Sequence, residues 1–188
     1  MIEISFLFGE LVFAAIWLII RAAMWIYQKR IDWKREAMLL LMYGNLAVMI
    51  RVTIYPFFHV DGKIQPLILE PEELFPLWIN LVPLVHIAEF DTTLDLLINI
   101  IGNVALFIPS GVILPILYKR LDHFWKVLAG GAFISLCIEL LQLSISARAS
   151  DIDDIILNTL GCAIGYGLFV WFKTLLSRRR KKHADIQS

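Results

Sequence analysis

Five long apolar segments constrain this sequence more than any other feature. They cover residues 4–27, 37–55, 94–118, 124–145 and 152–172, and a helix needs about 20 residues to cross a hydrocarbon core. The composition agrees, because 59% of the 188 residues are hydrophobic and only 18% are charged; an average soluble domain has roughly 25% charged residues. A soluble enzyme and a disordered chain are therefore excluded. The sequence predicts an all-α integral membrane protein with five transmembrane helices.

Positive charges are concentrated on one side of the predicted membrane. Thirteen of the 17 lysines and arginines fall in the turns at 28–36 and 119–126 or in the tail from residue 173 onward. Cytoplasmic loops of membrane proteins carry an excess of such residues. We therefore expect a multi-pass protein with its N-terminus outside and its C-terminus in the cytoplasm. The basic run at 178–182 is typical of an anchor after a last span, so no nucleic-acid partner is expected.

One loop is long, and it lies on the predicted outer side. Residues 57–93 contain six acidic residues and four prolines. Within this loop, residues 74–87 are apolar and aromatic but too few to span a bilayer, which predicts a partly re-entrant or interfacial segment. The expected organisation is an N-terminal transmembrane helix with its basic turn (1–36), a transmembrane domain (37–173) and a basic cytoplasmic tail (174–188).

The sequence gives no sign of a metal or a cofactor. Cys137 and Cys162 each lie in a long apolar stretch without the spacing of metal ligands, so we expect small buried hydrophobic side chains. His86 lies in the outer loop, and we expect a structural side chain there rather than a ligand.

Polar residues inside the predicted spans fall on narrow helical faces. At 100° per residue, Asp151, Asp154, Asn158, Gly161 and Gly165 share an arc of about 80°. The third and fourth spans carry similar stripes at Asp95, Asn99, Gly102, Asn103 and Ser110 and at Gly131, Ser135, Glu139, Gln142 and Ser146. Polar groups within a membrane are costly, so each such stripe indicates either a polar partner or a function.

The depth of these polar residues predicts where a site would lie. At a rise of 1.5 Å per residue, most of them lie within about 15 Å of the predicted outer surface, and the inner half holds almost none. This pattern predicts a polar pocket that opens outward and is closed below by apolar packing. The candidate binding residues are Arg51, Asn99, Asn103, Glu139, Gln142, Arg148, Asp151, Asp154 and Asn158.

A structural interpretation of the same residues stays open. Arg51 and Glu139 can neutralise one another, and the asparagines can form hydrogen bonds between helices. The glycines can serve only to let helices approach closely, which is their most common role in membranes.

Two motifs in the chain resemble the VanZ-like family. The first is Asn99-x3-Asn103-x3-Phe107-x-Pro109-x-Gly111, and the second is Glu139-x2-Gln142-x5-Arg148-x2-Asp151-x2-Asp154-x3-Asn158-x2-Gly161-x3-Gly165. Upstream, Arg51-x3-Tyr55-Pro56 and Asn80-Leu-Val-Pro83 fit the same family, so the resemblance covers residues 38–172. Ser110 is a minor departure, because relatives often have leucine there. The resemblance implies a protein of the bacterial cell membrane, and the namesake of the family is linked to low-level resistance to teicoplanin-type glycopeptides. It carries no settled catalytic mechanism.

Three hypotheses of function follow from these residues. In the first, the pocket binds a lipid-linked envelope precursor, a lipid head group or a lipoglycopeptide antibiotic, with Arg51 and Arg148 available for phosphate or carboxylate. In the second, the protein is an intramembrane hydrolase or transferase that acts on a lipid-linked phosphate or sugar through Glu139, Asp151 and Asp154. No nucleophile or metal motif supports this second hypothesis. In the third, the polar set is structural and the protein is a membrane scaffold.

Overall fold

A computed structural model describes residues 2–55, 59–60, 63–69, 79–83, 92–143, 145 and 150–187, with the backbone alone described at 59–60, 63–64 and 180–187. Five long helices dominate these residues: α1 (Phe6–Gln28), α2 (Trp33–Thr53), α3 (Thr93–Leu117), α4 (Phe124–Gln142) and α5 (Ile152–Gln187). All five are long and apolar enough to cross a membrane. The protein is therefore an all-α membrane protein with five spans, as the sequence predicts.

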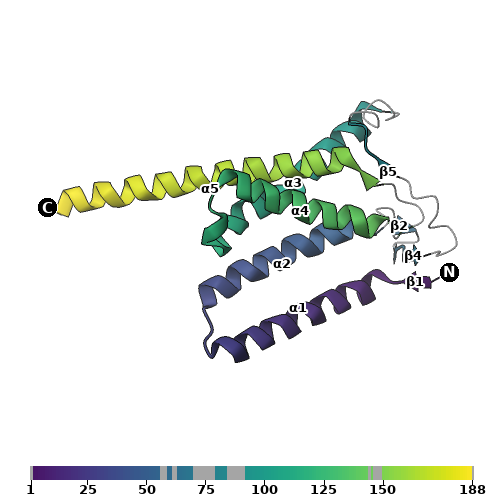
Figure 1. Cartoon of the computed structure of the whole chain (residues 1–188), viewed down its shortest axis with the longest axis horizontal. Coiled ribbons are helices and arrows are strands. Elements are labelled where there is room, and N and C mark those ends of the chain that lie inside the picture. The colour runs from purple at the N-terminus through teal and green to yellow at the C-terminus, as the bar shows by residue number, and fades with distance from the viewer. Residues whose placement is uncertain are drawn as a thin grey trace.

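The two ends of the helical bundle have different characters (Figure 1). At one end, which we call the strand end, lie the N-terminus and the short strands of the described residues. At the other, which we call the basic end, α1 turns into α2, and the short helix η3 (Lys119–Leu121) joins α3 to α4. At the basic end α5 extends well beyond the other helices towards the C-terminus (Figure 1). The two termini therefore lie at opposite ends of the bundle.

Side-chain caps fix the starts of three helices. The Ser5 hydroxyl accepts a hydrogen bond from the Phe8 backbone N–H, and the Thr92 hydroxyl does the same for Asp95. A carboxylate oxygen of Asp32 accepts the backbone N–H groups of Lys34 and Arg35. Such caps satisfy N–H groups that the first turn of a helix leaves unpaired.

Helix α3 is central to the bundle, since it contacts α2, α4 and α5 and packs most extensively against α5. Glycines permit this close approach: a Cβ atom placed on Gly161 would lie 2.3 Å from the Val104 carbonyl oxygen, and one on Gly165 would lie 2.1 Å from that of Ile108. The main apolar core forms around the same interface, from Met49, Phe107, Val127, Ile138 and Cys162.

Helix α1 buries the smallest share of its surface among the five spans. Near the basic end it is joined to α2 by an ion pair, in which Nε and Nη2 of Arg21 donate to the two carboxylate oxygens of Glu36, with 2.9 Å between Nε and Oε2. The sequence predicts that the inner half of the bundle is almost free of polar residues, and this ion pair is an exception. Arg21 is buried there because it has a carboxylate partner.

Short strands tie distant segments together at the strand end. β1 (Ile2–Ile4) pairs antiparallel with β4 (Leu67–Leu69), and β2 (His59–Val60) pairs antiparallel with β3 (Lys63–Ile64). β5 (Ile79–Asn80) pairs in parallel with β6 (Ser150–Asp151), directly before α5. The long loop is thus attached both to the N-terminus and to the start of the last helix. Most of the segment 74–87 that we expect to be re-entrant or interfacial lies outside the described residues.

The two cysteines differ in their surroundings, and neither forms a disulfide. Cys162 is fully buried, as expected, whereas Cys137 is exposed on the surface of the bundle. The expectation of a buried Cys137 is wrong because helical position alone does not say which face of α4 has a neighbour.

Candidate functional site

A groove of about 1200 Å³ lies along the seam between α2 and α3. Its wall on α2 includes Leu40, Leu41, Val48 and Val52, and its wall on α3 includes Ile98, Leu106, Pro109 and Ile113. Several of these side chains are more than half exposed, among them Leu40 (55%), Leu41 (56%) and Ile98 (62%). The groove therefore opens on the outside of the bundle, where a membrane protein meets lipid.

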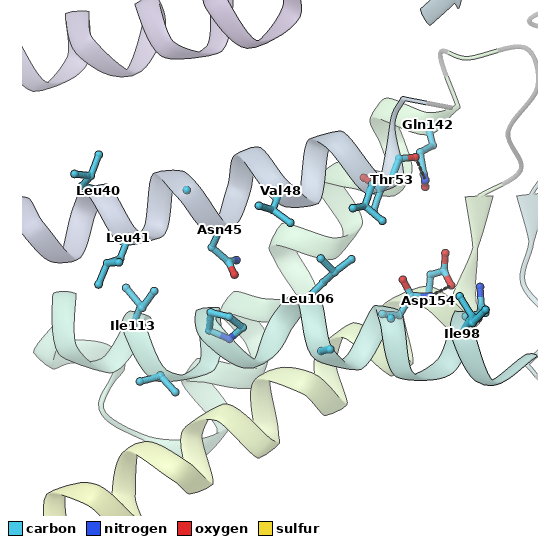
Figure 2. A pocket seen from close by; sticks show the side chains of 18 residues that line it. Leu40, Leu41, Asn45, Val48, Thr53, Ile98, Leu106, Ile113, Gln142 and Asp154 are labelled. Atoms are coloured by element: carbon cyan, nitrogen blue, oxygen red, sulfur yellow. Dashed lines mark hydrogen bonds between the residues drawn. The ribbon is translucent and has the colours of Figure 1, made fainter. Parts of the chain in front are cut away.

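The polar residues of the groove are concentrated near the strand end. Thr53, Asn99, Asn103, Gln142 and Asp154 line it there. Figure 2 shows Thr53, Gln142 and Asp154 at one end of the groove and Leu40, Leu41 and Ile113 at the other. The groove is thus amphipathic along its length, with hydrogen-bonding groups at one end and an apolar channel leading away from them.

Contacts between helices hold these polar side chains in place. Asn103 Nδ2 on α3 donates to Asp154 Oδ1 on α5, with 2.6 Å between the atoms. Gln142 Nε2 on α4 donates to the backbone oxygen of Thr53 at 2.9 Å and so pairs a carbonyl that the end of α2 leaves free. Farther along the groove, Asn45 Nδ2 donates to the buried Ser110 Oγ at 3.0 Å. Ser110, where relatives often have leucine, therefore has a specific hydrogen-bond partner in Asn45.

One buried atom of the groove lacks a partner. Gln142 is 5% exposed, and its Oε1 has no hydrogen-bond partner. A buried polar atom without a partner costs roughly 1–3 kcal/mol, so this acceptor is suited to a hydroxyl or N–H donor of a bound molecule. Among the described residues that line the groove, none carries a positive charge. The polar end therefore favours a head group that donates hydrogen bonds over a bare phosphate.

Four of the nine candidate residues line the groove: Asn99, Asn103, Gln142 and Asp154. Three others lie in neighbouring hydrogen-bond networks instead. Glu139, which is 2% exposed, accepts the Asp151 backbone N–H at 2.9 Å. Asp151 Oδ1 accepts from Asn80 Nδ2 at 3.1 Å, and Asn158 Nδ2 donates to Ser135 Oγ at 2.9 Å. Arg148 lies outside the described residues.

Arg51 lies close to α1 and is not among the residues that line the groove. Its guanidinium lies over the Phe6 ring, 5.4 Å from the centroid. Tyr55, four residues later, packs edge-on against the same ring at 5.3 Å. The Glu139 carboxylate accepts the Asp151 backbone N–H, and the interpretation of Arg51 and Glu139 as a mutually neutralising pair stays a prediction.

The carboxylates do not form a metal centre in the described part of the chain. No group of three or more His, Cys, Asp or Glu side chains there is arranged to hold an ion. Each of the three acids of the enzyme hypothesis accepts a hydrogen bond from the protein itself, and only Asp154 reaches the groove.

Sequence reasoning missed the walls of the groove and two of its polar residues, Asn45 and Thr53. The α2 positions 41, 45, 48 and 52 follow helical spacing and identify one face of that helix. Spacing alone does not reveal that this face is separated from α3 by a groove.

The sequence model of the VanZ/LLP1 family matches residues 38–173, which is well over half of the chain. The chain belongs to this VanZ-like family. Protein VanZ of Enterococcus faecium is 32% identical to the chain over 91 residues, which cover 48% of this chain and 52% of the relative. The matched part thus spans about half the length of that relative. Comparison with solved structures gives no significant match. The family assignment confirms the resemblance drawn from the motifs, and the α2–α3 groove lies wholly within the family region.

Proposed function

We propose that this VanZ-like protein binds a lipidated molecule in the α2–α3 groove and thereby contributes to resistance to teicoplanin-type glycopeptides. The observation that supports this proposal is the amphipathic groove itself. The hydrocarbon chain of the ligand lies along Leu40, Leu41 and Ile113, and its head lies at Asn99, Asn103, Gln142 and Asp154. Lipid-linked envelope precursors and lipid head groups belong to the same amphipathic class.

The length of the groove suits an acyl or prenyl chain. On α2 it extends from Leu40 to Thr53, which corresponds to about 20 Å of helix. Half of a typical hydrocarbon core is about 15 Å thick. A chain that enters beside the polar end therefore finds a largely apolar wall, interrupted at Asn45, along its path through one leaflet.

The chemistry of the polar end favours a head rich in hydroxyl and amide groups. The acceptor Gln142 Oε1 has no partner, and the Asp154 carboxylate lies nearby in the same lining. Sugars and peptides supply hydroxyl and N–H donors for such acceptors. A lipoglycopeptide combines these groups with a fatty acyl chain, which makes it the ligand that matches both ends of the groove.

The proposal places the protein in the bacterial cell membrane with the strand end outside. Its support is the accumulation of lysines and arginines at the basic end. In a cysteine-free background, Glu3→Cys is expected to react with a membrane-impermeant thiol reagent on intact cells, and Ser177→Cys only after lysis. The reverse pattern would overturn this orientation.

The test of the function compares two forms of one antibiotic. The chain is expressed in a glycopeptide-susceptible bacterium, and growth inhibition is measured with teicoplanin and with teicoplanin from which the acyl chain has been removed. Protection is expected against the acylated form and not against the deacylated form. Equal protection against both, or protection against neither, would contradict the proposal.

A pair of matched variants ties the effect to the groove. Gly44 lines the groove, whereas Gly167 lies outside it, and a Cβ on either glycine would meet no atom within 4 Å. Gly44→Leu adds a bulky side chain to the groove lining at a position where the Cβ itself meets no atom, and it is expected to abolish protection. Gly167→Leu, the same substitution at a glycine whose Cβ position is equally open, is expected to leave protection intact. Retained protection in Gly44→Leu would exclude the groove as the binding site.

A further inference from the structure

A second cavity, of about 910 Å³, lies at the basic end of the same α2–α3 seam. Its lining comes from the start of α2 on one side and from the end of α3 and η3 on the other. Neither the family assignment nor the proposed function uses this cavity.

Four cationic side chains surround the cavity: Lys34 and Arg35 on α2, and Lys119 and Arg120 on η3. All four residues are exposed. In the described part of the chain none of them takes part in an ion pair. Asp32 is the one acid among the described lining residues, and its Oδ1 accepts the backbone N–H groups of Lys34 and Arg35. The cavity therefore has an uncompensated positive charge from two separate elements.

The inner wall of the cavity is apolar. Met38 and Ile116 line it on the side towards the bundle. The seam then continues to Leu41 and Ile113, which line the α2–α3 groove. Tyr118 lies at the edge, with the Arg35 guanidinium 5.9 Å from the centroid of its ring. Positive charge thus lies at the end of the spans, and a hydrophobic surface begins one helical turn deeper.

We propose that this cavity binds the phosphate head group of an anionic membrane lipid, whose hydrocarbon chain lies against Met38 and Ile116. Guanidinium groups bind phosphate oxygens in bidentate fashion, and ammonium groups bind them as point charges. Basic pockets between transmembrane helices are suited to such head groups. The site differs from the α2–α3 groove in the charge of its ligand and in its position at the opposite end of the bundle.

Lipid retention by the purified full-length chain tests the proposal. The protein is exchanged into mixed micelles with equal amounts of phosphatidylglycerol and phosphatidylcholine, and the bound lipids are counted by native mass spectrometry. Preferential retention of phosphatidylglycerol is expected. The double variants Arg35→Gln/Arg120→Gln and Lys34→Gln/Lys119→Gln are each expected to lower that preference by about tenfold or more.

The matched control removes the same charge elsewhere. Arg178 and Arg179 lie on α5 and do not line the cavity, so Arg178→Gln/Arg179→Gln is expected to retain the preference. An equal loss in this control would show that binding reflects general surface charge and would overturn the proposal. Unchanged retention in both cavity variants would overturn it as well.

Two further measurements distinguish a lipid site from a free-phosphate site and this cavity from the α2–α3 groove. Inorganic phosphate at millimolar concentration is expected not to displace phosphatidylglycerol; displacement would assign the cavity to free phosphate and overturn the lipid assignment. Gly44→Leu is expected to leave the preference for phosphatidylglycerol over phosphatidylcholine unchanged, because Gly44 does not line the basic cavity. Failure of the groove proposal and failure of this one therefore give different results.

Discussion

Asn103 on α3 and Asp154 on α5 are joined by a hydrogen bond of 2.6 Å between Nδ2 and Oδ1. Both side chains also line the polar end of the α2–α3 groove. The bond therefore holds two spans together and fixes the position of a carboxylate where the head of a ligand would lie.

Asn103→Ala is expected to lower the free energy of unfolding by about 1–3 kcal/mol, because it removes one hydrogen bond from a partly buried carboxylate. Asp154→Asn keeps an oxygen acceptor and is expected to cost less. Thermal unfolding of the purified protein in detergent measures both. Asn99→Ala is the control, since Asn99 lines the same groove. An equal loss in Asn99→Ala would show that the effect does not come from the bond to Asp154.

Three glycines of α5, all within six residues of one another, differ sharply in their surroundings. A Cβ on Gly161 or Gly165 would overlap backbone of α3, whereas one on Gly167 would meet no atom within 4 Å. Gly165→Ala is therefore expected to cost about 1–3 kcal/mol or more, since a backbone carbonyl must shift. Gly167→Ala is expected to be neutral or to stabilise the helix by up to about 1 kcal/mol. Similar melting temperatures for the two variants would contradict the close α3–α5 packing.

These glycines show what helical periodicity predicts well. Asn158, Gly161 and Gly165 share one face of α5 because the angle between residues within a helix is a local property. The structure packs that face against α3 and α4. The five spans were predictable for a similar reason, since the length of an apolar segment is read directly from the chain.

Contacts between helices were harder to predict from the sequence. Arg51 has the depth of a pocket residue, but its guanidinium lies over the Phe6 ring of α1. Helix spacing also gives no sign of the groove between α2 and α3, because its width depends on how the two helices cross. The pairing of Ile2–Ile4 with Leu67–Leu69 involves three residues on each side, too few for a period of two to be recognised.

Asn158 and Ser135 form a buried hydrogen-bonded pair whose coupling free energy can be measured. Asn158 is 2% exposed and Ser135 is fully buried, and the bond between Nδ2 and Oγ is 2.9 Å long. Ser135→Ala leaves the amide N–H without this acceptor and is expected to cost about 1–3 kcal/mol. Adding Asn158→Leu removes the other partner as well. The double variant is therefore expected to lose less free energy of unfolding than the two single variants lose in sum. Strict additivity in unfolding measurements would show that the two side chains are not coupled.

The ion pair between Arg21 and Glu36 is expected to control how α1 docks on the bundle. The two donor nitrogens of Arg21 engage both carboxylate oxygens of Glu36, and α1 otherwise buries less of its surface than any other span. Arg21→Ala leaves the partly buried Glu36 carboxylate without its guanidinium partner, which is expected to cost less than the about 3–5 kcal/mol of a fully buried pair. Limited proteolysis in the α1–α2 turn reports on docking, and faster cleavage is expected in Arg21→Ala and in Glu36→Ala. The exchanged variant Arg21→Glu/Glu36→Arg restores opposite charges and is expected to recover part of the resistance to cleavage. If the exchanged variant is cleaved as fast as the single variants, the pair acts through exact side-chain geometry rather than through charge.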